Sequence, residues 1–207
     1  MQIYWIKAQA PRQVLALARH LGIEAGYVRL DGAGLRSAAY AALNPNRKAP
    51  TLVDGDVVLW EASAIMAYLC LKAGSDLWPT DPMQQVEMLR WIGWNDCHWS
   101  RATGPFYFEH IVKATFALGS PDRQALKADV PDLLKYAAVL DAHLQDRSHV
   151  ACGRLTIADF RLAAMATDWR EAEMPLGEFP NIVRWLDGLM RLPAWADPWP
   201  AAEPATA

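Results

Sequence analysis

The sequence predicts an α/β domain followed by an all-helical domain. Strand patterns occur only in the first third of the 207 residues, a stretch with two prolines follows, and helical periodicity dominates the remainder. We therefore expect the α/β domain at 1–76, a linker at 77–82, the helical domain at 83–200 and a flexible tail at 201–207.

Composition excludes several classes of protein. Hydrophobic residues make up 53% of the chain, which is typical of a folded protein. A net charge of -3 gives no basic footprint for nucleic acid or for an anionic membrane. No apolar run reaches the roughly 18 residues that a bilayer requires, and no signal peptide is evident, so we expect a cytoplasmic protein.

The cysteines favour neither a disulfide framework nor a metal site. There are three of them, far apart and without a Cys-x-x-Cys pair: Cys70, Cys97 and Cys152. Free thiols are the expected state, and we predict no bound metal.

The first part of the chain reads as a strand–helix–strand unit. Gln2 to Ile6 is an apolar run typical of a strand, and Ala8 to Pro11 is expected to be a loop. Apolar residues recur at helical spacing from Arg12, and Gly22 ends that helix. Tyr27 to Leu30 then predicts a second strand, parallel to the first.

A hairpin and a helix complete the predicted α/β domain. After a short helix up to Leu43 and a turn at 44–46, Thr51 to Val53 and Val57 to Trp60 are joined by Asp-Gly-Asp, which indicates a β-hairpin. Ala62 to Lys72 has helical periodicity. The predicted order is thus βαβ followed by ββα.

Helical patterns fill the second domain. They cover Met83–Ala102, Phe106–Leu118, part of Pro121–Leu144 with a possible restart at Pro131, Ile157–Thr167 and Pro180–Leu192. Thr156 and Asp159 have the spacing of a capping box, so we assign them to helix capping and not to chemistry.

Two short segments could bind a ligand. Pro50 lies between a turn and an expected edge strand, and a cis Ala49–Pro50 bond would turn the N–H and C=O of Ala49 toward an extended peptide; a trans bond is the alternative. Glu61-Ala62-Ser63 opens a helix, whose N–H groups suit a carboxylate or phosphate. Glu61 would either cap that helix or bind an ammonium group.

These segments carry a family resemblance. Asn-Pro-x-x-Lys-Ala-Pro-x-Leu at 44–52, Gly55 and Leu-x-Glu-x-x-Ala-Ile-x-x-Tyr-Leu at 59–69 resemble the binding signature of the cytosolic glutathione S-transferase superfamily, with a bacterial-like character. Thr-Ile-Ala-Asp-Phe at 156–160, Phe-Pro-Asn at 179–181 with Trp185, and Leu-Pro-Ala at 192–194 are similar to later motifs of that family.

The resemblance implies a thioredoxin-like N-terminal domain, a homodimer and glutathione as co-substrate, with no other cofactor. It implies that the glutathione cysteinyl backbone pairs with Ala49 before a cis Pro50. The γ-glutamyl ammonium would lie near Glu61, its carboxylate at Ala62, and the glycyl carboxylate near Lys48. Ala62 departs from the serine common in the family, and Ser63 could compensate.

The group that would activate the glutathione thiol is not defined by the sequence. The family usually has Tyr, Ser or Cys after the first strand, whereas 7–12 reads Lys-Ala-Gln-Ala-Pro-Arg. Tyr4 is one candidate and could equally be a buried strand residue. Gln9, the loop N–H groups and Arg12 are the others.

An electrophile would bind beside helices of the second domain. Trp91, Asn95, His98 and Ala102 share one face of an ideal helix, and Asn95, His98, Trp99 and Phe106 could line an aromatic acceptor pocket. An ordinary aromatic core is the alternative.

We therefore expect a transferase that conjugates glutathione to a hydrophobic electrophile and serves in detoxification. The alternatives are a glutathione-binding module with little catalysis, or a glutathione-dependent reductase or isomerase. The absence of cysteine in the first loop disfavours disulfide exchange.

Overall fold

The computed structural model describes residues 1–201, which fall into two units. One unit contains 1–78 together with the described residues from Leu192 onward, and the other spans Pro79–Arg191. The predicted flexible tail at 201–207 lies, apart from its first residue, outside the described residues.

The first unit is built on a four-stranded mixed sheet with the strand order β2-β1-β3-β4. Its strands are β1 (Gln2–Trp5), β2 (Gly26–Arg29), β3 (Thr51–Asp54) and β4 (Val57–Trp60). β1 and β2 are parallel, while β3 runs antiparallel to both β1 and β4. The predicted thioredoxin-like order of elements is confirmed, but β3 lies inside the sheet and is not the edge strand that we expected.

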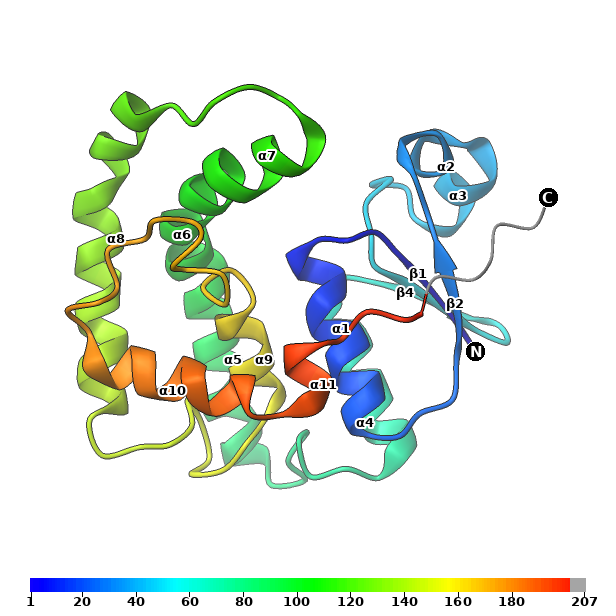
Figure 1. The fold of residues 1–207 in the computed structure, drawn as a ribbon. Coiled ribbons are helices and arrows are strands. Elements are labelled where there is room, and N and C mark those ends of the chain that lie inside the picture. The colour runs from blue at the N-terminus through cyan, green and yellow to red at the C-terminus, as the bar shows by residue number, and fades with distance from the viewer. Residues whose placement is uncertain (202–207) are drawn as a thin grey trace. The chain divides into compact units, whose positions relative to one another are not determined.

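Helices cover both faces of this sheet. α1 (Gln9–His20) and α4 (Ala62–Ala73) lie side by side (Figure 1), and α4 contacts β3 and β4. The short helices α2 (Gly32–Arg36) and α3 (Ala38–Leu43) follow β2. Tyr40 of α3 bonds to Thr51 on the sheet face opposite to that of the buried Leu52.

The helix α1 begins earlier than predicted. Its first residue is Gln9, so the expected loop from Ala8 to Pro11 is reduced to the residues before Gln9. Pro11 is compatible with this start because the first helical turn needs no N–H donor. The residues expected to form a loop are therefore held at a helix N-terminus.

The second unit is helical throughout its regular elements. One continuous helical run contains α5 (Pro82–Trp94), the π-helical η1 (Asn95–Trp99), α6 (Ser100–Tyr107), the π-helical η2 (Phe108–Val112) and α7 (Lys113–Phe116). α8 (Arg123–Leu144), α9 (Ile157–Ala163) and α10 (Pro180–Met190) follow. Its core is formed by buried side chains such as Leu133, Leu140 and Phe160.

Three helix predictions for this unit were wrong in detail. The expected break between Ala102 and Phe106 is absent: Pro105 lies within α6 and the backbone widens to π geometry just after it. Pro131 does not restart α8, which runs through it. α9 ends at Ala163 and not at Thr167.

The C-terminal segment groups with the first unit, although we expected the helical domain to extend to residue 200. α11 (Pro193–Ala196) contacts α1. Nη2 of Arg12 donates to the Trp195 carbonyl at 2.8 Å, and the Trp5 and Trp199 rings stack with centroids 5.8 Å apart. A buried arginine and paired indoles thus attach this segment, through contacts that sequence spacing does not reveal.

The predicted capping box at α9 is confirmed. The Asp159 carboxylate is fully buried and accepts from the N–H groups of Val150 and Thr156 at 2.8 and 2.9 Å and from the Trp185 indole at 3.0 Å. Burial raises the pKa of Asp159, and these donors act against that rise. One side chain therefore joins three segments of the helical unit.

His143 of α8 gives the helical unit a pH-dependent stability. Nε2 lies 2.7 Å from the Val150 carbonyl, which can only accept, so Nε2 carries the proton. Burial lowers the pKa of His143. Because the folded state favours the neutral ring, His143 makes its full contribution to the free energy of unfolding above its unfolded pKa of about 6.5. That contribution is lost as the pH falls toward the lower pKa of His143 in the folded state.

We accordingly expect His143→Gln to flatten the pH dependence of stability. Denaturant unfolding followed at pH 7.5, 6.5 and 5.5 should show a smaller loss of unfolding free energy for this variant than for the unmodified protein. Replacing the exposed His20 by Gln serves as the control. Parallel curves for the unmodified protein and His143→Gln would contradict the assignment.

Candidate functional site

Three segments meet at one edge of the sheet, namely the edge at which β1 and β4 end and β3 begins. The register pairs Tyr4 with Thr51 and Thr51 with Trp60, so the end of β1, the start of β3 and the end of β4 share that edge. The residues just beyond these strand ends are 7–9, 48–50 and 61–63. The two binding segments and the thiol-activating segment suggested by the sequence are thus brought to one edge of the first unit.

The segment before β3 presents an unpaired backbone. The Ala49–Pro50 peptide bond is cis. The Lys48 carbonyl accepts from the Tyr40 hydroxyl and from Nδ2 of Asn44, each at 2.7 Å. Within the described part of the chain, no hydrogen bond engages the N–H or C=O of Ala49. This backbone can therefore pair with an extended ligand.

Sequence reasoning missed the two side chains that hold this turn. Tyr40 and Asn44 also bond to Oγ1 of Thr51, at 2.8 and 3.1 Å, so together they fix both sides of Pro50. Burial raises the pKa of Tyr40, which keeps its hydroxyl protonated as a donor. Asn44 was assigned to a turn and to the family signature, but neither its hydrogen bonds nor those of Tyr40 were predicted, because no local pattern marks them.

Glu61 has a strained backbone and does not cap its helix. It has φ 71° and ψ 117°, and its side chain makes no capping hydrogen bond to α4. A positive φ is costly for a residue with a Cβ and often marks a functional position. The capping role is therefore not realised, and the exposed Glu61 carboxylate is available to a cationic group.

The start of α4 can receive an anion. The first N–H groups of a helix lack acceptors within it, and they carry the positive end of its dipole. Ala62 is buried there and Ser63 is half-buried. The exposed Lys48 supplies a cation from the segment before β3.

Two of the proposed activating groups, Gln9 and Arg12, have different environments. Gln9 is the first residue of α1 and only 4% exposed, at the positive end of that helix. The Arg12 guanidinium is buried, bonds to the Trp195 carbonyl and lies 5.4 Å from the Trp195 ring centre. Arg12 therefore attaches the C-terminal segment, and its catalytic role stays a prediction.

Tyr4 is engaged by its own strand and by α3. Its hydroxyl donates to Oε1 of Gln2 at 3.1 Å, and its ring lies 5.8 Å from that of Tyr40. Tyr4 belongs to β1 but is half-buried, so the alternative of a buried strand residue is met only in part. These contacts link Tyr4 to Gln2 and Tyr40 and not to Ala49.

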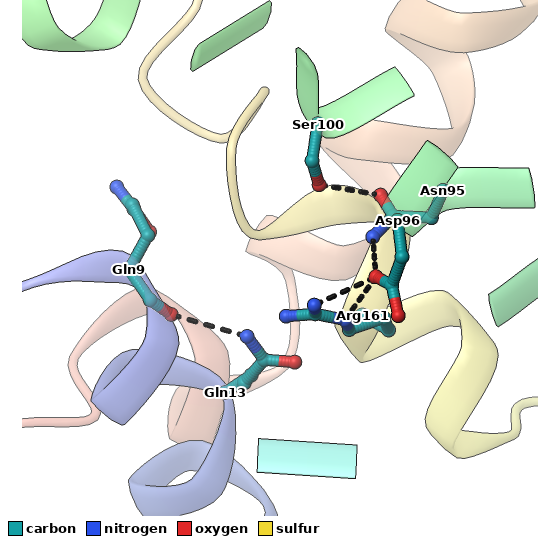
Figure 2. A network of polar contacts seen from close by, with 6 residues as sticks. All are labelled: Gln9, Gln13, Asn95, Asp96, Ser100 and Arg161. Carbon is teal, nitrogen blue, oxygen red and sulfur yellow. Dashed lines mark hydrogen bonds and ion pairs between the residues drawn. The ribbon is translucent and has the colours of Figure 1, made fainter. Parts of the chain in front are cut away.

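The predicted acceptor residues lie in different environments. Figure 2 shows the Asn95 side chain bonded to Asp96 and Ser100, while Arg161 bonds to Asp96. The same view draws the bond from Nε2 of Gln13 to the Gln9 carbonyl, within α1. Asn95 is thus fully buried in a polar network of the helical unit.

Trp99, Phe106 and His98 have other environments. The Trp99 indole donates to the Leu162 carbonyl at 3.0 Å, and both Trp99 and Phe106 are buried. The half-exposed His98 stacks on Tyr136 of α8 with centroids 5.0 Å apart. The ideal helical spacing was misleading because η1 is π-helical and changes the angular position of each later residue.

Two kinds of feature are absent from residues 1–201. Within them, no cluster of three or more His, Cys, Asp or Glu side chains could hold a metal ion. Over the same residues, none of the helices combines the length and hydropathy that a membrane span requires.

Two protein-family models match this chain. The model of the glutathione S-transferase N-terminal domain matches residues 2–70, and that of the C-terminal domain matches residues 99–193. The chain belongs to the glutathione S-transferase family. The family resemblance predicted from the two segments around Pro50 and Glu61 is thereby confirmed.

Similar proteins agree with this family. Glutathione S-transferase 2 of Anopheles gambiae is 28% identical over 89% of this chain and 88% of its own length. Glutathione S-transferase D7 of Drosophila melanogaster is 29% identical, over 91% and 83%. The theta-class enzyme of Xanthomonas axonopodis pv. citri, solved with glutathione bound, has 27% identity and a TM-score of 0.82, with 94% of each chain covered.

Proposed function

We propose that this protein binds glutathione at the sheet edge formed by 48–50 and 61–63. The observation that carries the proposal is the Ala49 backbone before cis Pro50, whose N–H and C=O are unpaired among the described residues. At the same edge, Glu61 has a positive φ and its side chain makes no capping hydrogen bond to α4. An extended tripeptide with one ammonium and two carboxylates is complementary to that arrangement. The glutathione-bound Xanthomonas relative supports the same ligand.

Each part of glutathione has a chemical partner in this proposal. The cysteinyl backbone pairs with the N–H and C=O of Ala49. The γ-glutamyl ammonium binds Glu61, and its carboxylate accepts from the N–H groups at the start of α4. Lys48 binds the glycyl carboxylate. Ala62 lacks a hydroxyl for that carboxylate, a loss of about 1–2 kcal/mol that Ser63 can partly replace.

In the proposed reaction the glutathione thiol loses its proton to solvent and the thiolate attacks an electrophilic carbon of a hydrophobic small molecule. With an aryl halide, the halide ion leaves as the C–S bond forms. A free thiol has a pKa of about 8.5, so the site must favour the thiolate at neutral pH. We assign that role to the Gln9 amide and to the N–H groups at the start of α1, where the helix dipole is positive. No metal or further cofactor is required.

A second candidate is a glutathione-binding module with little turnover. It is favoured by the absence of a hydroxyl or thiol side chain at 7–12 and by the bond that engages the Tyr4 hydroxyl with Gln2. Binding and conjugation must therefore be measured separately.

The turnover assay uses glutathione with an activated aryl halide near pH 7. Gln9→Ala is expected to lower kcat/KM by about ten- to a hundredfold, because one donor to a developing anion is removed. Tyr4→Phe is expected to change it by less than about twofold. A fully active Gln9→Ala variant would contradict the assignment, and glutathione binding without turnover would favour the second candidate.

We also propose a cytoplasmic homodimer that acts in detoxification. α5 exposes three large apolar side chains on neighbouring turns, which suits a protein contact: Met83 is 72% exposed, Val86 57% and Leu89 50%. Light scattering should give twice the chain mass of 23.1 kDa. A monomeric mass at micromolar concentration would contradict the dimer.

A further inference from the structure

A polar cavity of the helical unit lies beside α6 and α8, two helices that are in contact (Figure 1). It has a volume of about 210 Å³, and its lining includes His98, Arg101, Asp129, Asp132 and Tyr136. That volume is below the roughly 300–1,000 Å³ of sites for drug-sized molecules, so a small ligand is expected. We propose that this cavity binds a basic amino acid of the lysine class, which carries one carboxylate and two ammonium groups.

Charged side chains of both signs line the cavity without pairing. Arg101 belongs to α6, whereas Asp129 and Asp132 belong to α8. Within residues 1–201, no ion pair or hydrogen bond engages these three side chains. A ligand that carries charges of both signs can therefore pair with groups on the two helices at once.

The balance of charge determines the kind of ligand. The cavity lining holds one guanidinium and two carboxylates, so the complementary ligand has one anionic and two cationic groups. A diamine would leave Arg101 unpaired and would be repelled by it. An amino acid with an uncharged side chain would leave one of the two carboxylates without a partner.

The spacing of the carboxylates suits a short aliphatic chain between two ammonium groups. Asp129 and Asp132 are three positions apart on α8, so their Cβ atoms lie about 5–6 Å apart on one face of the helix. The aliphatic chain of lysine spans a similar distance between its two nitrogens. Each ammonium can then pair with one carboxylate, and the lysine carboxylate can pair with Arg101 on the facing helix.

Aromatic rings form the less polar wall of the cavity. His98 stacks on Tyr136, with ring centroids 5.0 Å apart and planes inclined by 24°. Long cationic side chains place their methylene groups against apolar surface while their charged ends stay with polar groups. The lining thus offers a surface for the aliphatic chain as well as partners for the three charged groups.

The test compares three probes by amide NMR titration of the intact protein. L-lysine carries all three charged groups, norleucine lacks the second ammonium, and 1,5-diaminopentane lacks the carboxylate. Lysine should bind about three- to fivefold more tightly than either of the other two, because each of them loses one ion pair.

Two substitutions separate the contributions of the two helices. Arg101→Gln should weaken lysine binding about three- to fivefold and should not weaken diamine binding. Asp132→Asn should weaken the binding of both lysine and the diamine. Lys127→Gln and Asp146→Asn make the same charge changes at exposed positions outside the cavity, and as matched controls they should alter neither.

Several outcomes would overturn the proposal. These are the absence of saturable lysine binding, equal affinity for lysine and norleucine, or equal effects of Arg101→Gln and its control Lys127→Gln. Glu61→Gln, at the proposed glutathione site, should leave lysine affinity unchanged. A loss of lysine affinity in Glu61→Gln would show that lysine occupies the glutathione site and not this cavity.

Discussion

The Glu61→Gln variant is expected to bind glutathione about ten- to a hundredfold more weakly than the unmodified protein. The change keeps the size of the side chain and removes the charge that would hold the γ-glutamyl ammonium. A charge-assisted hydrogen bond contributes about 1.5–3 kcal/mol, which corresponds to that loss. Titration calorimetry with glutathione measures it.

Two further variants separate binding from stability. Asp56→Asn removes a charge at the hairpin, at the opposite end of β4, and should leave glutathione affinity unchanged. Glu61→Gly should weaken binding while keeping or raising the free energy of unfolding, because glycine tolerates the observed φ of 71°. Unaltered affinity in Glu61→Gln would contradict the proposed ammonium partner.

The Asp159→Ala variant is expected to destabilise the protein by roughly 3–5 kcal/mol. It leaves the buried N–H groups of Val150, Thr156 and Trp185 without their acceptor. An unsatisfied buried donor costs about 1–3 kcal/mol, and the removed carboxylate also leaves a void. Denaturant unfolding at pH 7 measures the change.

An exposed cap of the same chemistry provides the comparison. Asp122 accepts from Gln124 and Ala125 at the start of α8, where water can replace the lost acceptor. Asp122→Ala should cost about 1 kcal/mol. Equal losses for the two variants would show that burial of Asp159 adds nothing beyond ordinary capping.

Local patterns were sufficient to predict the strands, the hairpin and the candidate binding segments, although they did not predict that β3 lies inside the sheet. The Asp-Gly hairpin fixes β3 beside β4, and the change from strand to helix after Trp60 places Glu61 at a helix start. Both features depend on residues close together in the sequence. The candidate site around Ala49 and Glu61 could therefore be located before the fold was known.

Long-range contacts explain what could not be predicted. The role of Arg12 depends on a carbonyl 183 positions later, which no periodicity indicates. Asn95 and His98 were grouped on the assumption of α-helical geometry, and η1 is π-helical. Nor does sequence indicate that Tyr40 and Asn44 hold the turn before Thr51.

The central claim is that Ala49 and the start of α4 bind glutathione, and an amide NMR titration tests it most directly. With saturating glutathione, the N–H resonances of Ala49 and Ala62 should move downfield as they gain acceptors, while that of Asp56 at the hairpin stays in place. If glutathione binds and the Ala49 and Ala62 resonances do not move, the ligand lies elsewhere and the proposed site is wrong.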